Sequence, residues 1–525
     1  MYKSQIRIGA VLSYVHMALS IIIGLSYTPI MIRLLGQNEY GLYSTVSSLI
    51  AILSVLNLGF GSAYQKYYSK YKKAEAFNKI KNLNGLFLTI FSILGVVALC
   101  CGLFLLFHIE FVFGSGLTIA EYDTAKILLG IMIAQLTLFF PTSVFTTIIT
   151  AHEKFLFSKS LMLLKTALSP LLTLPLLLLG YKSIALVSVS LIVSILCDVL
   201  SVYYVVFRLK EQFRFGKIEA GLFKELFAYI AFIALHLIVD QVNWNVDKVL
   251  LGRFCGTGIV AIYSVGYSIY SYMIYFGTPI SSLFIPKIHR ITADSGLTIT
   301  EKKNAYTKVF TKVGRIQYIL VGCIVSGFIL FGKPFLQLWV GDGYNSSYWV
   351  ALLLMIPGAI DLIQVIGIEI QRSQNLHKFR GIVYIVMACI NIIISIPLCI
   401  HWGAIGSAVG TALSFIVVQG IIINIYLYKK CHVDIFFFWR NIMQISLGIL
   451  PPFVIGGVCM YFFTINSWTL LLLGIAAYCI IYLISVWLIG LNADEKEIAC
   501  SLGQKLGIIH IFYKIKSRLQ HNDKK

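Results

Sequence analysis

The sequence predicts an all-α membrane protein with about 14 transmembrane helices, arranged as two pseudo-symmetric six-helix bundles plus two C-terminal helices. Three observations lead to this prediction. Apolar stretches of 18 or more residues run almost end to end, basic residues gather in alternate connections, and the two halves of the chain share sequence markers. Each stretch is long enough to cross a hydrocarbon core of roughly 30 Å as a helix.

The composition agrees with a lipid environment. Hydrophobic residues make up 58% of the chain and charged residues 12%, whereas about a quarter of the residues of a soluble domain are charged. Lys and Arg number 42 against 22 Asp and Glu, a net charge of +20. Most of these cations fall in alternate loops and at the termini, which is the pattern of membrane topology. We therefore expect contact with membrane lipids and no nucleic-acid partner.

The first span follows a short charged segment with Lys3 and Arg7. Its apolar run extends about 25 residues to Arg33, too long for the core of a signal peptide, so it is read as a permanent span. The fourteen predicted spans are 8–33, 40–64, 84–107, 125–150, 160–179, 183–207, 225–247, 257–284, 313–332, 349–371, 381–400, 404–428, 441–463 and 468–489.

The connections between these spans set the predicted orientation. Opposite connections are short and poor in cations, and 108–124 is acidic. The positive-inside rule then places both termini in the cytoplasm. The basic connections are 66–81, 154–159, 208–224, 287–312, 372–380, 429–440 and the tail from Lys496.

A repeat of about 220 residues divides the chain. His16 in span 1 matches His236 in span 7, and Tyr43 in span 2 matches Tyr263 in span 8. Six spans per unit give both halves the same orientation, as in transporters built from parallel repeats. The predicted parts are an N-terminal lobe at 1–210, a C-terminal lobe at 225–430, helices 13 and 14 at 440–490, and a basic cytoplasmic tail at 491–525.

Polar residues within spans face a bundle interior or a hydrated cavity, because they are costly in hydrocarbon. Span 7 carries a stripe on one helical face, and span 1 carries a similar stripe at the equivalent place, so the two stripes are predicted to line a cavity. The span 7 stripe is His236, Asp240, Asn243 and Asp247, and the span 1 stripe is Ser13, His16, Ser20, Gly24 and Tyr27.

These residues have alternative readings. Asp247 could form a local ion pair with Lys248, and His16 and His236 are either core histidines or proton carriers. Asp240 lies deep in its span without a nearby cation, so we expect it to couple transport to an ion, with His236 as a relay. The alternative is that Asp240 only hydrogen-bonds sugar hydroxyls or a neighbouring helix.

Lys165 lies one turn into span 5. It either reaches the membrane surface or offers a cation to an anionic substrate, with Asp198 as its candidate partner.

Catalytic and cofactor signals are weak. Gly327 to Lys333 fits the first part of a phosphate-binding loop, but Pro334 replaces the Ser or Thr that the motif needs. The eleven cysteines have no metal-ligand spacing. The sequence thus predicts no enzyme activity, no catalytic residue, no cofactor and no metal.

Three sequence motifs resemble a known family. They are Arg33-Leu34-Leu35-Gly36 with Tyr40-Gly41-Leu42-Tyr43, Leu58 to Ala63, and Asp247 to Gly252 with Val260 to Ser264. In this order they resemble polysaccharide flippases of the Wzx type, which carry O-antigen or capsule repeat units, in the multidrug/oligosaccharidyl-lipid/polysaccharide exporter superfamily. The resemblance covers nearly the whole chain.

The resemblance implies a flippase of the bacterial cytoplasmic (inner) membrane. It would move undecaprenyl-diphosphate-linked oligosaccharide by alternating access, for surface polysaccharide biosynthesis, with a polysaccharide polymerase and a chain-length regulator as partners. Arg33 and Lys165 would neutralise the diphosphate, and His16, Ser20, Asn243 and Asp247 are further candidate ligands. The alternatives are a cation-coupled multidrug antiporter of the same superfamily and a membrane polysaccharide polymerase. The short outer loops argue against the polymerase.

Overall fold

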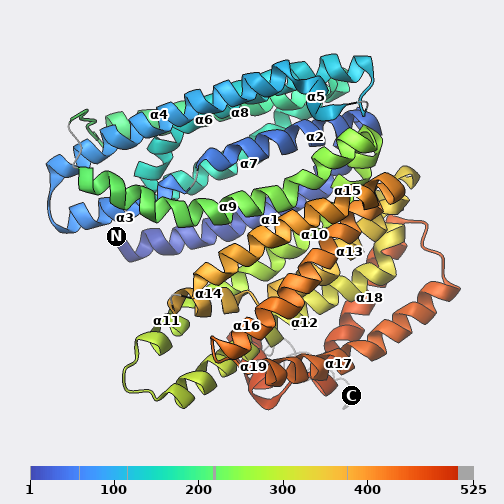
Figure 1. Cartoon of the computed structure of the whole chain (residues 1–525). Helices are drawn as coiled ribbons and strands as arrows, with labels where there is room; N and C mark the ends of the chain where they lie inside the picture. Colours follow the sequence, from blue (N-terminus) through green and yellow to red (C-terminus); the bar gives the residue numbers. More distant parts are fainter. Residues whose placement is uncertain (1, 58, 115, 217–219, 375, 506–525) are drawn as a thin grey trace, which may run out of the picture. The chain divides into compact units, whose positions relative to one another are not determined.

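The described residues of the computed structural model are 2–57, 59–114, 116–216, 220–374 and 376–505, and within them the chain forms helices and no β-strand (Figure 1). This confirms the predicted all-α class. Twelve helical segments in these ranges are long and apolar enough to cross a membrane.

Two segments explain why twelve are found where fourteen spans were predicted. Phe379–Lys429 counts as one segment of 51 residues, long enough for two crossings at about 1.5 Å per residue. It is broken at Gly403, whose φ of 55° lies in the region that favours glycine. The second segment is α9 (Ala220–Phe254), which has 35 residues and contains the predicted span 225–247, but is not among the twelve.

Packing divides the chain into two compact units. Unit 1 consists of Met1–Tyr275, Trp339–Gly358 and Leu376–Ile423, and unit 2 consists of Phe276–Leu338, Ala359–Asn375 and Asn424–Lys525. These units group residues that contact one another, and such grouping does not test whether the two halves of the sequence are repeats. The lobes at 1–210 and 225–430 therefore stay a prediction.

Unit 1 contains the N-terminal helices, most of α10 and α13, and α15. Its α-helices are α1 (Tyr2–Leu35), α2 (Gln37–Leu53), α3 (Phe60–Lys73), α4 (Phe77–Phe107), α5 (Ile109–Phe113), α6 (Ile119–Ala151), α7 (Phe155–Leu178), α8 (Lys182–Tyr203), α9, α10 (Thr257–Ser282), α13 (Asn345–Ile363) and α15 (His377–Phe415). Short 3₁₀ or π turns add Ser54–Asn57, Tyr204–Arg208, Asp342–Tyr344 and Ile416–Ile422.

Within unit 1, α4, α6 and α8 run side by side (Figure 1). Glycines let α4 approach α6 closely: a Cβ on Gly95 would lie 3.0 Å from the Thr137 carbonyl oxygen, and one on Gly102 would lie 2.7 Å from Ile133. Helices in lipid associate through such van der Waals contact, because the apolar solvent provides no hydrophobic driving force. The aromatic rings of Tyr64 on α3 and Phe87 on α4 form an edge-to-face contact, with ring centres 5.2 Å apart.

Unit 2 contains the remaining helices. These are α11 (Ile285–Ala293), α12 (Ile299–Trp339), α14 (Ile366–Ser373), α16 (Ile423–Lys429), α17 (Ile435–Phe462), α18 (Trp468–Ser485), the π turn Val486–Gly490 and α19 (Ala493–Lys505).

Two helices of unit 2 extend beyond the predicted spans. The predicted connection 287–312 is mostly helical, because it forms α11 and the first turns of the 41-residue α12. The predicted tail at 491–525 begins with α19, and residues 506–525 lie outside the described part of the chain.

Candidate functional site

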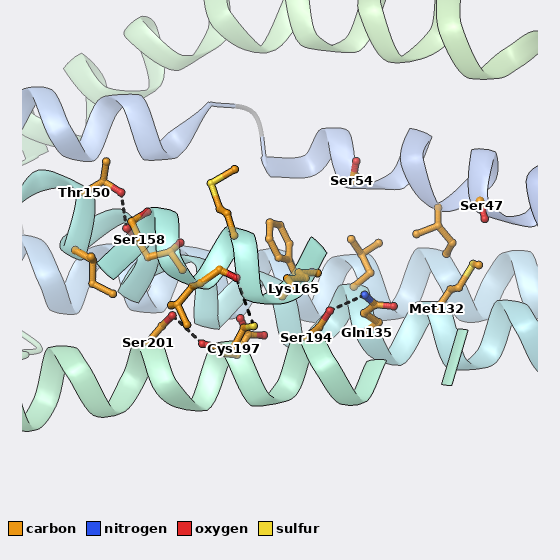
Figure 2. Close-up of a pocket in the computed structure, with 18 residues that line it drawn as sticks. Ser47, Ser54, Met132, Gln135, Thr150, Ser158, Lys165, Ser194, Cys197 and Ser201 are labelled. Atoms are coloured by element: carbon orange, nitrogen blue, oxygen red, sulfur yellow. Dashed lines mark hydrogen bonds between the residues drawn. The ribbon is translucent and has the colours of Figure 1, made fainter. Parts of the chain in front are cut away.

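A cavity of about 620 Å³ lies within unit 1, among α2, α6, α7 and α8 (Figure 2). Its size is within the usual range of small-molecule sites. Hydroxyl and amide side chains dominate its polar lining, which consists of Ser47, Ser54, Gln135, Thr146, Thr150, Ser158, Lys165, Ser194, Asp198 and Ser201.

Gln135 of α6 is fixed by the serines of α8. Its amide nitrogen donates to Ser194 Oγ at 2.9 Å and to Ser190 Oγ at 3.2 Å. Because the amide donates twice to the protein, its carbonyl oxygen is the group that it can offer to a ligand hydroxyl. The arrangement suits a ligand rich in hydroxyl groups.

Lys165 and Asp198 bring opposite charges to the cavity from α7 and α8. Lys165 is exposed, and its ammonium acts electrostatically on the Asp198 carboxylate. The Thr142 hydroxyl is a hydrogen-bond partner of Asp198. An anionic ligand that reached Lys165 would therefore compete with Asp198 for the same cation.

The span 1 candidates lie beside α7 rather than on the wall of this cavity. His16 Nε2 lies 3.0 Å from Thr166 Oγ1, one residue from Lys165. Ser20, one turn further along α1, is half-buried. The contact between His16 and Thr166 links α1 to α7 close to the cationic position.

Arg33 lies at the other end of α1 from the N-terminus. Its Nη2 donates to the Trp339 carbonyl oxygen at 3.3 Å, and the Trp339 indole nitrogen donates to the Leu25 carbonyl oxygen at 2.7 Å. Arg33 is thus fixed against the α1 backbone through Trp339, and it does not line the cavity that contains Lys165.

Asp247 forms a buried polar network inside unit 1. Its carboxylate is 2% exposed and accepts hydrogen bonds from Tyr263 at 2.7 Å, Ser407 at 2.8 Å and Thr411 at 2.6 Å. The neighbouring Lys248 ammonium lies 4.6 Å from the centre of the Tyr267 ring, a cation–π contact. Three hydroxyl groups from α10 and α15 therefore hold the carboxylate that could have paired with Lys248.

Of the other span 7 candidates, the structure describes the side chain of Asn243 only. Asn243 is buried, and its Oδ1 has no hydrogen-bond partner among the described residues. The side chains of His236 and Asp240 lie outside the described part of the chain, so their coupling role stays a prediction.

A family model described as "Polysaccharide biosynthesis protein" matches residues 9–292, more than half of the chain. The chain belongs to this family. The match confirms the predicted relation to polysaccharide biosynthesis proteins.

Similar proteins agree with this assignment. The chain is 27% identical over 178 residues to the probable flippase AglR of Haloferax volcanii, and the match covers 33% of this chain and 35% of AglR. The fold is similar to that of the lipid II flippase MurJ in its inward closed conformation. The two chains are 16% identical, the TM-score is 0.66, and the match covers 91% of this chain and 97% of that one.

A second solved structure with a similar fold is that of a drug transporter. An inward-facing multidrug resistance transporter of the MATE family is 14% identical, with a TM-score of 0.59, over 79% of this chain and 99% of that one. These likenesses show that this polysaccharide biosynthesis protein shares its fold with both transporters.

Sequence reasoning missed several polar residues of these two sites. Ser190 and Ser194 precede Asp198 on α8 at i−8 and i−4, so the repeat of small hydroxyls on one helical face was the available signal. Tyr263 belongs to the repeat and to a family motif, but neither predicts its hydrogen bond to Asp247. Ser407 and Thr411 gave no comparable signal, because isolated hydroxyls are common in transmembrane helices.

Proposed function

We propose that the protein is a flippase that moves an undecaprenyl-diphosphate-linked oligosaccharide across the bacterial cytoplasmic membrane by alternating access, for surface polysaccharide biosynthesis. The observation that carries the proposal is a single lysine, Lys165, in a cavity whose other polar side chains are hydroxyls, the amide of Gln135 and the carboxylate of Asp198. The hydroxyls and amides suit sugar hydroxyls, and the ammonium suits a diphosphate.

The proposed substrate is amphiphilic, with a polar head group and an apolar polyprenyl chain. A polyprenyl chain is as apolar as the lipid and costs little when it stays in the bilayer. Only the head group then needs a polar path. A polysaccharide polymerase and a chain-length regulator would act on the translocated product.

The proposal predicts a different outcome for each substitution of Lys165. In a flippase-deficient strain, Lys165→Ala should abolish complementation and Lys165→Arg should retain part of it, because arginine keeps the cation but changes its shape. The matched control is Lys159→Ala on the same helix, since Lys159 does not line the cavity. Arg33→Ala tests the second candidate cation in the same assay.

Membrane content of each variant is measured by immunoblot. Full activity of Lys165→Ala at a normal membrane level would contradict the proposal. Loss of activity in Lys159→Ala as well would mean that the helix, and not the cation in the cavity, is required.

A second candidate function is cation-coupled drug export. The observation that favours it is the buried Asp247 carboxylate, a group that could bind or release an ion, in a chain with a MATE-like fold. Export of a cationic dye by cells that express the chain, lost in Asp247→Asn, would favour this function. The flippase proposal predicts no export of the dye.

A further inference from the structure

Unit 2 contains a separate cavity of about 380 Å³ where α11, α12, α17 and α19 meet. Three lysines line it: Lys287 follows the N-terminus of α11, and Lys308 and Lys312 lie one turn apart on α12. The ammonium groups of these three lysines form no hydrogen bond or ion pair with another described residue. The cavity therefore presents ammonium groups without a polar partner in the described part of the chain.

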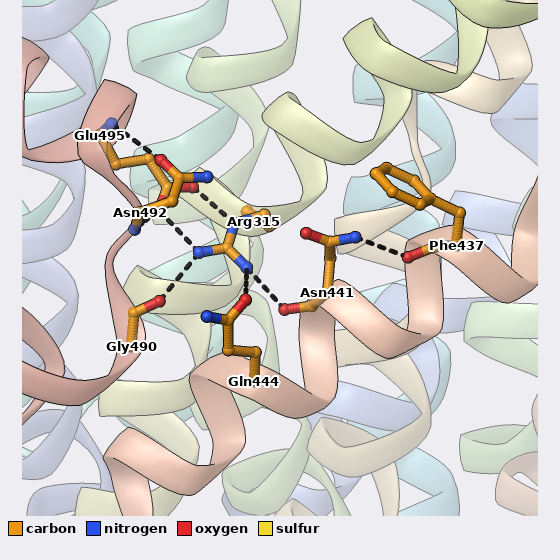
Figure 3. A network of polar contacts seen from close by, with 7 residues as sticks. All are labelled: Arg315, Phe437, Asn441, Gln444, Gly490, Asn492 and Glu495. Atoms are coloured by element: carbon orange, nitrogen blue, oxygen red, sulfur yellow. Dashed lines mark hydrogen bonds and ion pairs between the residues drawn. The ribbon is translucent and has the colours of Figure 1, made fainter.

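A buried ion pair forms one wall of this cavity (Figure 3). Arg315 is 1% exposed and binds the Glu495 carboxylate with two nitrogens, Nε to Oε1 at 2.6 Å and Nη2 to Oε2 at 2.7 Å. The same guanidinium donates to the carbonyl oxygens of Asn441 at 2.7 Å and Gly490 at 2.8 Å. Arg315 thus fixes α12, α17 and the start of α19 together.

This pairing decides the charge of the cavity. Glu495 is fully engaged by Arg315 and by the Asn492 backbone amide at 3.0 Å, so it does not neutralise the lysines. Asp494 is the other carboxylate on the lining. Three ammonium groups against one remaining carboxylate leave an excess of positive charge, which favours an anionic ligand.

The apolar part of the lining indicates an amphiphile. Phe284, Val309 and Phe437 share the cavity with the lysines, and Phe437 is half-exposed. A neighbouring cavity of about 460 Å³ shares Lys287 and adds Arg290, Asp294 and the exposed Leu283. A soluble anion would use the cations alone, whereas a lipid would also cover these apolar side chains.

We propose that this cavity binds the phosphate headgroup of an anionic membrane lipid, at the predicted cytoplasmic ends of α12 and α17. Lys287, Lys308 and Lys312 would contact the phosphate, and Phe284 and Phe437 would contact the glycerol and the first methylenes of the chains. This cavity shares no lining residue with the cavity that contains Lys165. The proposal therefore concerns dependence of the protein on lipid and not recognition of the transported substrate.

The test measures retained lipid and thermal stability in the purified full chain. The Lys287→Gln, Lys308→Gln and Lys312→Gln triple variant is compared with wild type in neutral detergent, after addition of phosphatidylglycerol, phosphatidylcholine or inorganic phosphate. Native mass spectrometry counts bound lipid, and the apparent Tm reports stabilisation, because a ligand that binds only the folded state raises Tm. A matched control removes three lysines of α3, in the variant Lys70→Gln, Lys72→Gln and Lys73→Gln.

We expect phosphatidylglycerol, but not phosphatidylcholine, to be retained and to raise the Tm of wild type and of the α3 control. The cavity variant should retain one phosphatidylglycerol fewer and lose most of the Tm increase. Equal losses in both triple variants would overturn the proposal in favour of general charge attraction. An equal Tm increase with inorganic phosphate would overturn the assignment to a lipid.

Discussion

The His152 imidazole and the Glu211 carboxylate lie 2.9 Å apart, Nε2 to Oε1, and join the end of α6 to the segment after α8. The second carboxylate oxygen accepts from Asn84 Nδ2 at 2.9 Å, and Tyr64 donates to Asn84 Oδ1 at 2.6 Å. The other imidazole nitrogen, Nδ1, lies 3.0 Å from the Ile148 carbonyl oxygen. Nε2 also lies 2.9 Å from the Tyr68 hydroxyl, so the imidazole joins Glu211 and Tyr68 to the end of α6.

This pair predicts a stability that depends on pH. Burial of the Glu211 carboxyl raises its pKa, but the hydrogen bond and charge of His152 and the hydrogen bond of Asn84 lower it more, so the pKa lies below its ordinary value of 4.5. A lowered pKa in the folded state gives stabilisation that is complete above the unfolded pKa. That stabilisation is lost as the pH falls through the folded pKa.

Glu211→Gln should therefore destabilise the protein by about 1–3 kcal/mol near neutral pH, the usual cost of losing a charged hydrogen-bond partner. Apparent Tm values of wild type and variant are measured in detergent from pH 7 downward. The two curves should converge in acid, below pH 4.5. A difference that stayed constant across this range would mean that the carboxylate charge is not what stabilises the fold.

The Arg315–Glu495 pair gives a prediction for unit 2. The side chains are only 2% and 6% exposed, so Arg315→Ala would leave a carboxylate buried without its partner. Such a loss costs about 3–5 kcal/mol, whereas replacement of both charges by apolar groups is often close to neutral. We expect a large fall in Tm for Arg315→Ala and a partial recovery in the double variant Arg315→Met, Glu495→Met.

The control for this prediction is the more accessible pair Arg372–Glu369 at 2.7 Å, whose side chains are 52% and 17% exposed. Arg372→Ala should change stability by less than about 1 kcal/mol, as exposed pairs usually do. Equal effects of Arg315→Ala and Arg372→Ala on Tm would show that burial does not strengthen the first pair.

The Asp247 network predicts the effect of losing a hydroxyl inside the membrane. Tyr263→Phe removes one of three donors to a buried carboxylate, and Thr411→Val removes another. Each should cost about 1 kcal/mol, since hydrogen bonds between transmembrane helices are modest. Their combined cost should exceed the sum, because the second loss leaves the carboxylate with Ser407 alone. A double-mutant cycle on Tm measures this, and strict additivity would contradict a shared network.

Much of the fold was predictable because membrane burial leaves a simple mark on the sequence. Apolar length identified α4, α6 and α18, and the positions of Lys and Arg gave an orientation. Length could not show that 287–312 is helical, because α11 and the start of α12 are polar on one side and resemble a charged loop. The break of α2 before α3 was also missed, since Gly59, with φ 73°, interrupts an otherwise apolar run.

The site was predictable only in part. Lys165 and Asp198 stood out because charges are rare inside spans. Gln135 and the α8 serines did not, because small polar side chains in lipid serve packing as often as binding. The Arg315–Glu495 pair joins residues 180 positions apart, a separation at which a single sequence carries no pairing signal.

The predicted topology has a direct test. Reporter fusions after Lys81 and after Asp123 should report opposite sides of the membrane, because α4 would cross it once between these positions. A fusion after Lys429 should share the side of the Lys81 fusion. Finding the first two fusions on the same side would contradict the fourteen-span topology and the parallel repeat.

Asp198 gives the last prediction, because its carboxylate competes with an anionic ligand for Lys165. Asp198→Asn removes the charge but keeps the shape and a partner for Thr142. If Lys165 binds the diphosphate, a short-chain isoprenyl diphosphate should bind Asp198→Asn about threefold to tenfold more tightly. This corresponds to roughly 1 kcal/mol of charge interaction in a partly hydrated cavity.

The measurement is a fluorescence titration of the purified variants. Asp123→Asn is the control, since Asp123 is an exposed acid on α6, the helix that carries Gln135, and it lies away from the cavity lining. Its affinity should match that of wild type. Unchanged or weaker binding by Asp198→Asn would show that Asp198 does not oppose the ligand, and Lys165 would then be a structural partner of Asp198 and not the cation that receives the diphosphate.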